Sequence, residues 1–173
     1  MTTMLDTFLN IDPVSRIRRN HGLEHATLHV LASRHPHKNM AGYSNTGGFW
    51  IMGDLTAEDI DSAAHEALER MQKGEHGLAV HPNCGTNFVT SGALAGAAGA
   101  FAMFGAGPRI KDKFERLSLA ALFATLALIV AQPLGNLLQA RVTTSGYPGT
   151  LQIVGVTPTP RGSMKAHRVI TRG

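Results

Sequence analysis

The 173 residues suffice for one small domain, or for a small domain with a membrane element. Hydrophobic residues make up 43% of the chain. A net charge of +4 can indicate nucleic-acid binding, but membrane proteins that face anionic lipid show the same balance, and we expect no nucleic-acid partner. The single cysteine, Cys84, excludes an internal disulfide and leaves an inert side chain, a metal ligand or a nucleophile. The first 20 residues lack the apolar core of a secretory signal, so we expect no leader.

The first predicted helix has Asp12 as its N-cap and Pro13 in its first turn. It ends at Arg34, before Pro36. One stripe, expected to be buried, recurs every three or four residues: Val14, Ile17, His21, Glu24, His25, Leu28 and Leu31. The opposite side is expected to hold Arg16, Asn20, Thr27 and Arg34.

Residues 35–48 are expected to form a turn-rich connector, followed by a short buried strand, "GFWIMG", that carries Trp50 as a core residue or interfacial anchor. A second helix is predicted from the capping pair Thr56 and Asp59 to about Gly74. "GLAV" before His81 has the pattern of another strand, so residues 48–81 predict a βαβ-like unit.

Two runs without Asp, Glu, Lys or Arg follow, and each is long enough to cross a bilayer, which takes about 20 residues. We expect membrane helices at about 88–107 and 117–139, joined as a hairpin by the basic loop "RIKDKFER". Gly92 and Gly96 have GxxxG spacing, which we interpret as packing against the second run, with homodimer formation as the alternative.

The fold class expected is therefore α+β: a small soluble domain of two helices and a few short strands, with an inserted transmembrane two-helix hairpin. Its parts are residues 1–85, the hairpin 86–140, and a tail 141–173 whose segments "TLQIVGV" and "HRVIT" return as strands around the turn "TPTPRG". The basic residues of the loop favour a loop on the cytoplasmic side. The first domain, expected to have no leader, favours a cytoplasmic first domain, which puts the loop on the other side of the membrane. We expect a multi-pass protein of the inner (cytoplasmic) membrane with both termini in the cytoplasm.

The segment "HGLEHATLHV" places costly groups on a face that should be core, so a compensating partner is expected. His21 and His25, four residues apart on a helix, point the same way and can share a metal ion. Glu24 can be a ligand, a second-shell acceptor or a general base. The spacing matches the H-x-x-E-H pattern of inverted zinc peptidases, although the further acidic ligand of that class is missing unless Glu66 or Glu69 supplies it.

A second group of candidate ligands is "HPNCGTNF", in which His81 and Cys84 stand three residues apart in a tight turn. With His21 and His25 they offer three nitrogen atoms and one sulfur atom, a set suited to zinc or another divalent metal. Four protein ligands would close a structural site, whereas three ligands and a water would leave a catalytic one.

Together "HGLEH" and "HPNCGTNF", followed by hydrophobic helices, resemble the YqhQ-like bacterial membrane proteins, a family of predicted metal-dependent enzymes. The resemblance covers about residues 16–88 and the hairpin layout, and the tail does not match. It implies functional roles for the five motif residues His21, Glu24, His25, His81 and Cys84.

The other histidines carry less weight. His29 continues the four-residue series and is expected to flank the site or face solvent, and His167 can return to the site if its strand joins the sheet. We expect His35, His37 and His65 to be solvated. His76 is expected to lie in a turn.

The leading hypothesis is a membrane-anchored zinc-dependent hydrolase in which Glu24 activates water and the substrate is a membrane peptide or a lipid-linked molecule. The alternative is a noncatalytic accessory or assembly protein with a structural metal site. A third hypothesis makes Cys84 the nucleophile of a thiol-dependent hydrolase, which leaves Glu24 and His21 without a role.

Overall fold

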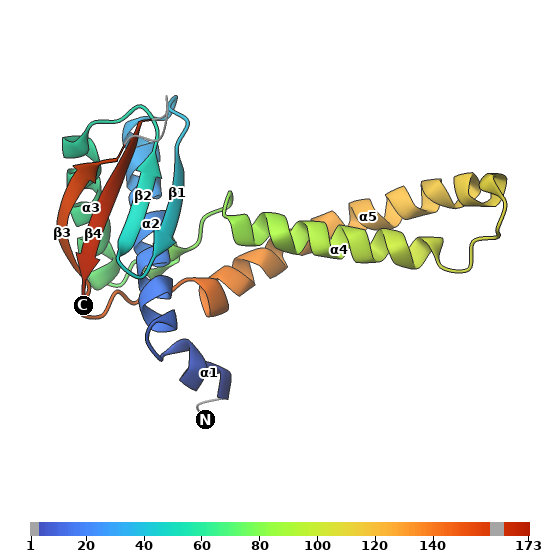
Figure 1. The fold of residues 1–173 in the computed structure, drawn as a ribbon, viewed down its shortest axis with the longest axis horizontal. Coiled ribbons are helices and arrows are strands. Elements are labelled where there is room, and N and C mark those ends of the chain that lie inside the picture. The colour runs from blue at the N-terminus through green and yellow to red at the C-terminus, as the bar shows by residue number, and fades with distance from the viewer. Residues whose placement is uncertain (1–3, 160–164) are drawn as a thin grey trace. The chain divides into compact units, whose positions relative to one another are not determined.

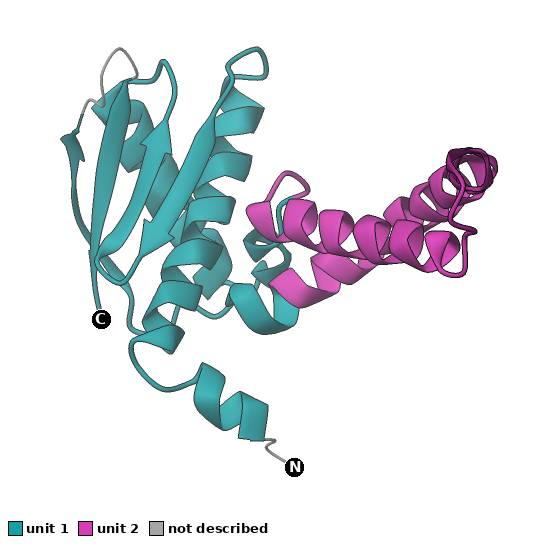
Figure 2. Ribbon diagram, turned by 45° about the vertical axis from the view of Figure 1, so that its right-hand side comes forward, with its two compact units in different colours: residues 1–81, 140–173 teal, residues 82–139 magenta. Residues whose placement is uncertain are grey.

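The computed structural model describes residues 4–159 and 165–173. It is a mixed α+β structure with five α-helices and one four-stranded antiparallel sheet (Figure 1). The chain divides into two compact units, one of residues 1–81 and 140–173 and the other of residues 82–139 (Figure 2). We refer to them as the sheet unit and the helical unit.

The sheet contains strands from both ends of the chain, in the order β1-β2-β4-β3. β1 (Ala41–Asn45) and β2 (Gly48–Met52) form a hairpin in which Tyr43 lies opposite Trp50. β4 (Ala166–Arg172) pairs with β2 on one side and with β3 (Gln152–Pro158) on the other. The predicted C-terminal strands therefore exist and complete the sheet, while the middle of the turn between them, residues 160–164, lies outside the described residues.

The sheet unit contains the helices α1 (Met4–Leu9), α2 (Val14–Arg34) and α3 (Ala57–Gln72) and the 3-10 helix η1 (His76–Ala79). α2 and α3 pack on one face of the sheet, and the core between them includes Leu23, Phe49 and Ile60, all fully buried. Thr56 caps α3 as expected, since its hydroxyl accepts the amide N–H of Asp59 at 3.1 Å.

Three expectations for α2 are wrong, and the first is the burial of Ile17, which is 38% exposed. The N-cap is Pro13 rather than Asp12, and it makes no side-chain cap bond. Asn20 and Thr27, expected on the solvent side, are fully buried. Asn20 donates to the Asn45 carbonyl and accepts the Thr171 hydroxyl, both at 2.7 Å, so β1 and β4 cover a face that the polar pattern had marked as exposed.

The expected βαβ-like unit is also wrong. "GLAV" lies largely in η1, whose last residue is Ala79, and the pairings of the described strands are all antiparallel. The strand that was missed is β1, in the expected connector. Its sequence, AGYSN, has weak strand propensity, and its pairing with β2 stabilises the extended conformation.

The helical unit contains α4 (Gly85–Met103) and α5 (Ile110–Leu138), which pack along each other. α5 continues into a π-helical turn, η2 (Gln139–Thr143), of which all but the first residue belongs to the sheet unit. Within the described residues one continuous helical segment, Ile110–Thr143, is long and apolar enough to cross a membrane, with a mean hydropathy of 2.0. Only 11% of its most apolar stretch is buried, unlike the core helix of a globular domain. The expectation of two such helices is thus met by α5 and not by α4.

The glycine spacing in α4 does not serve the contact expected of it. A Cβ atom built on Gly92 or Gly96 would meet no atom of the described structure within 4 Å, so these glycines do not allow a close approach to α5. The close contact lies elsewhere, because a Cβ on Gly135 of α5 would lie 2.4 Å from the side-chain oxygen of Asn87 in α4.

Candidate metal centre

Four histidines of the sheet unit form one cluster. His21, His25 and His29 lie one turn apart on α2, and His81 follows η1 along the chain. The ring centroids of His21 and His25 are 4.4 Å apart, and that of His81 lies 5.6 Å from His25 and 4.9 Å from His29. His25 is 2% exposed, whereas the other three are half-buried. We call these four residues the histidine cluster.

Main-chain carbonyls orient the imidazoles. Nδ1 of His25 lies 2.7 Å from the Ala79 carbonyl oxygen, and Nδ1 of His21 lies 3.0 Å from that of Thr143. A carbonyl oxygen only accepts, so each Nδ1 carries a proton, and in the neutral ring the lone pair is then on Nε2. Histidines that bind metals are commonly held in this way, by a hydrogen bond from the second ring nitrogen.

His29 and His81 form the other end of the cluster. Nε2 of His29 donates to the Val80 carbonyl at 2.9 Å, which places its lone pair on Nδ1 in the neutral ring. Burial lowers the pKa of His81, and electrostatic repulsion from His29 lowers it further. His81 therefore favours the neutral form, which is the form that binds a metal. His29 belongs to the cluster rather than facing solvent.

Glu24 is buried, 4% exposed, and its side chain extends toward β1. A Cβ atom built on Gly42 would lie 2.2 Å from Oε1 of Glu24, so only a glycine at that position of β1 leaves room for the carboxylate. One residue along an α-helix is a rotation of about 100°, which separates Glu24 from His25 around α2. The carboxylate thus lies on the side of α2 that faces the sheet.

Cys84 belongs to the helical unit, where it is the N-cap of α4 and buried. It follows His81 by three residues, and an extended chain spans at most about 3.6 Å per residue, so their Cα atoms lie within about 11 Å of each other. The covalent chain therefore limits how far the backbone of Cys84 can lie from that of His81.

The remaining predicted residues lie elsewhere. His167 is buried in β4, opposite Ile51 of β2, so its strand joins the sheet as the prediction required, but no contact ties it to the cluster in the described structure. His65 is exposed on α3 and hydrogen-bonded to the Asp61 carbonyl. His76 begins η1 and donates to the Gly146 carbonyl at 2.8 Å.

Trp50 lies half-exposed rather than in the core. The Arg168 guanidinium stands 4.0 Å from its ring, and the ring of Tyr43 lies 5.7 Å away. These contacts pair it with residues of β4 and β1 on the outer face of the sheet.

The sheet unit and its histidine cluster define an α+β domain with a candidate metal centre. Residues 16–156 match a family described as a domain of unknown function, DUF6391, and the chain belongs to that family. It is 35% identical over 139 residues to an uncharacterized protein of Picosynechococcus sp., an alignment that covers 75% of this chain and 66% of that protein. The chain thus spans slightly less than two thirds of this relative, and no solved structure matches it.

Proposed function

We propose that this protein is a membrane-associated metal-binding protein in which His21, His25, His81 and Cys84 hold one zinc ion. The observation that carries the proposal is the orientation of His21 and His25 by carbonyl oxygens, which places both lone pairs on Nε2. A ring nitrogen of one histidine lies within 4.8 Å of a ring nitrogen of the other. A zinc ion bound at about 2.0–2.1 Å from each nitrogen needs only a small approach of the two rings.

Burial supports a ligand role for these rings. A fully buried imidazole such as His25 loses its hydration, and a metal bond through Nε2 is compatible with the hydrogen bond that Nδ1 makes to the Ala79 carbonyl. The neutral form favoured at His81 and the short chain distance to Cys84 supply the third and fourth ligands of the proposal. A set of three nitrogens and one sulfur suits zinc, and another divalent metal is the alternative.

The second candidate function is zinc-dependent hydrolysis, and the buried carboxylate of Glu24 favours it. A carboxylate is expensive to bury, and Glu24 lies within one helical turn of two proposed ligands. Its carboxylate extends toward β1 in the structure, so a role as general base would require the side chain to turn toward the histidine cluster. The resemblance to YqhQ-like proteins, a family of predicted metal-dependent enzymes, also favours hydrolysis. Without turnover, the same residues would form the structural metal site of a noncatalytic accessory or assembly protein.

Sheet topology supports a membrane hairpin rather than a single span. β2 precedes α4 in the chain and β4 follows α5, yet the two strands are paired in one sheet. Paired strands lie on one side of a membrane, so the chain between them crosses an even number of times. If α5 crosses, α4 crosses as well, and its 19 residues without a charged side chain span about 28 Å.

We propose in addition that this two-span protein lies in the cytoplasmic membrane, with the sheet unit and both termini on the cytoplasmic side. Its direct partner is the lipid bilayer, and a hydrolase at this place would act on a membrane peptide or a lipid-linked substrate.

The deciding experiment is elemental mass spectrometry of the full chain purified in mild detergent. His25→Asn is the informative variant, because the asparagine amide can still donate to the Ala79 carbonyl while Nε2 is lost. We expect about one zinc per chain in the wild type, and none in His25→Asn or Cys84→Ala. The matched control is His65→Asn, on the exposed face of α3, which should keep its zinc.

Folded wild-type protein without metal above background would overturn the proposal, and so would His25→Asn protein with a full zinc content. Zinc retained in Cys84→Ala with loss of a measured hydrolase activity would instead identify Cys84 as a nucleophile.

A further inference from the structure

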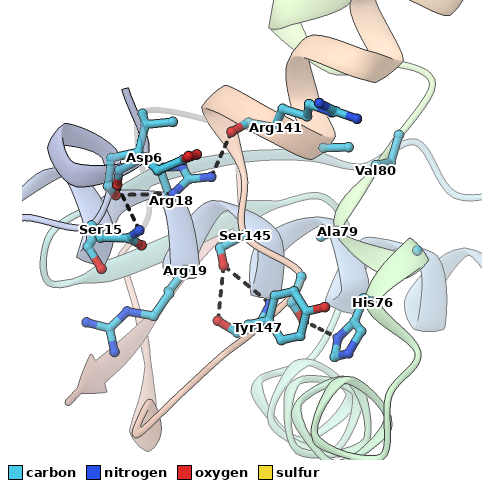
Figure 3. Close-up of a pocket in the computed structure, with 15 residues that line it drawn as sticks. Asp6, Ser15, Arg18, Arg19, His76, Ala79, Val80, Arg141, Ser145 and Tyr147 are labelled. Carbon is cyan, nitrogen blue, oxygen red and sulfur yellow. Dashed lines mark hydrogen bonds between the residues drawn. The ribbon is translucent and has the colours of Figure 1, made fainter. Parts of the chain in front are cut away.

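The sheet unit contains a cavity of about 620 Å³, and none of the four residues of the histidine cluster lines it. Its walls come from α1, the start of α2, η1 and the segment that follows α5 (Figure 3). The volume is typical of a small-molecule site, since such sites measure about 300–1,000 Å³.

Basic side chains dominate the charged lining. Arg18, Arg19 and Arg141 line the cavity with one acidic residue, Asp6, and Figure 3 shows Arg18 between the other two arginines. Arg18 holds the wall together: it donates to the carbonyls of Leu9, Arg141, Val142 and Thr144, at distances of 2.7 to 3.2 Å. These bonds occupy most of its five N–H donors, so the capacity to bind an anion rests with Arg19 and Arg141.

Arg19 has a hydrogen-bond donor that can bind an anion. Its Nε is buried and meets no hydrogen-bond acceptor in the part of the chain that the structure describes. The nearest carboxylate, that of the exposed Asp12, lies 3.8 Å from Nη2, too far for a hydrogen bond. A guanidinium with unused donors matches the oxygen atoms of a phosphate group, which it can bind in a bidentate manner.

The rest of the lining combines polar residues, Asn10, Ser15 and Ser145 among them, with apolar and aromatic ones. Leu9, Val80, Ala140 and Tyr147 contribute to the cavity, and the Tyr147 ring packs at 4.0 Å from the ring of His76. A fully hydrophilic anion would leave this surface without a partner, whereas a molecule with a charged group and an apolar part would cover both.

We propose that this cavity binds a phosphate-bearing amphiphile, namely the headgroup region of an anionic phospholipid. Arg141 follows the last residue of α5 by three positions, so the covalent chain keeps the site close to the end of the helix that is apolar enough to span a bilayer. Basic residues at that position meet the headgroups of anionic lipids. The lipid source rests on the proposed membrane insertion of α5, while the phosphate chemistry does not.

The test is isothermal titration calorimetry of the full chain in an uncharged detergent. The probes are dihexanoyl phosphatidylglycerol, dihexanoyl phosphatidylcholine and glycerol 3-phosphate. We expect saturable binding of the phosphatidylglycerol, and at least about tenfold weaker binding of the other two. Arg19→Gln and Arg141→Gln should each weaken the binding at least about tenfold, because each removes a charge-assisted hydrogen-bond donor.

Arg172→Gln is the matched control, since it removes the same charge from an exposed position of β4 outside the cavity. An equal loss of affinity in this control would overturn the site in favour of general attraction between charges. Equal affinity for phosphatidylcholine would overturn the anionic preference. Equal affinity for glycerol 3-phosphate would overturn the lipid source and retain a site for a soluble phosphate compound.

Two further variants separate folding and zinc from lipid binding. If Arg19→Gln does not fold, Arg19→Lys keeps the charge but loses the planar donors, and an affinity between those of wild type and background is expected. His25 does not line the cavity, so folded His25→Asn protein should bind phosphatidylglycerol as the wild type does even when its zinc is lost. Loss of lipid binding in that variant would overturn the independence of the two sites.

Discussion

Main-chain oxygen atoms orient three imidazoles of α2. The carbonyls of Thr143, Ala79 and Val80 each accept a hydrogen bond from one imidazole of α2. Fixing the tautomer and the ring direction in advance lowers the conformational entropy that metal binding would otherwise remove. The contribution of single residues to the site therefore extends beyond the proposed ligands.

Glu24 tests whether the site is catalytic. Because its carboxylate extends toward β1, we expect Glu24→Gln to retain zinc, as measured by elemental mass spectrometry. If Glu24 is the general base, hydrolysis of a lipid-linked or peptide substrate should fall by at least about 100-fold. Loss of zinc in the glutamine variant would instead identify a ligand or an essential second-shell acceptor.

His81 predicts a dependence of stability on pH in the zinc-free protein. Its pKa is lowered by burial and then by His29, so the unfolded chain takes up a proton near its usual pKa of about 6.5 that the folded chain does not. The unfolded state then binds more protons, and the free energy of unfolding falls as the pH falls below about 6.5 toward the folded pKa. Urea titrations at about pH 7.5 and about pH 5.5 should show a smaller difference for His81→Asn than for wild type. An undiminished difference would contradict this account, and His65→Asn is the control.

At the scale of elements, α2 is the central helix of the sheet unit. Asn20 contacts strands on one side, the histidines contact η1 on another, and Gly22 lies against the segment that follows η2. A helix surrounded in this way has little surface left for water, which explains why polar side chains on most of its circumference are buried and hydrogen-bonded.

Gly22→Ala should be strongly destabilising. Its Cβ would lie 2.1 Å from the Ser145 carbonyl oxygen and 3.3 Å from the Cβ of Ala79, and the first of these neighbours is main chain that cannot rotate away. Overpacking of this kind costs about 1–3 kcal/mol in the free energy of unfolding. Thermal denaturation should show the decrease.

Gly92→Ala provides the comparison for Gly22→Ala, because nothing lies within 4 Å of its Cβ position. This variant should be neutral, or more stable by a few tenths of a kcal/mol up to about 1 kcal/mol, from the higher helix propensity of alanine. Strong destabilisation of Gly92→Ala would show that the glycine face of α4 is covered after all.

At the scale of the whole molecule, the sheet limits how the chain can meet a membrane. Its strands come from residues 41–52 and 152–172, on both sides of the helical unit in the sequence. The proposed membrane hairpin is compatible with this sheet, because the chain would leave and re-enter the sheet unit on the same side of the bilayer.

Insertion of α5 is tested by Ile129→Arg, which places a charge on an exposed position, 66% accessible, of the apolar segment. A central arginine disfavours insertion by about 2.5–3.5 kcal/mol. We expect a smaller fraction of the variant to remain in membranes after carbonate extraction. Val154→Arg, at an exposed position of β3, is the control and should leave that fraction unchanged. An equal membrane fraction for Ile129→Arg would contradict insertion.

Local sequence patterns determined several elements and the candidate residues by themselves. The four-residue spacing of His21 and His25 specified that both project from one side of a helix, and the run from Leu117 to Ala140 specified an apolar helix. The two C-terminal strands could also be predicted from the sequence, since alternating and β-branched residues favour an extended backbone. These features depend on neighbours within a few residues, which is why the sequence alone reports them.

Only the tertiary structure decided what surrounds those residues. The partners of His25 and His21 are carbonyls 54 and 122 positions away, and every residue carries a carbonyl, so no residue type marks them in advance. The contact of His29 with His81, the burial of Asn20 and the formation of β1 likewise arise from segments distant in the chain. Periodicity identifies the face of a helix, but packing determines which neighbour that face meets.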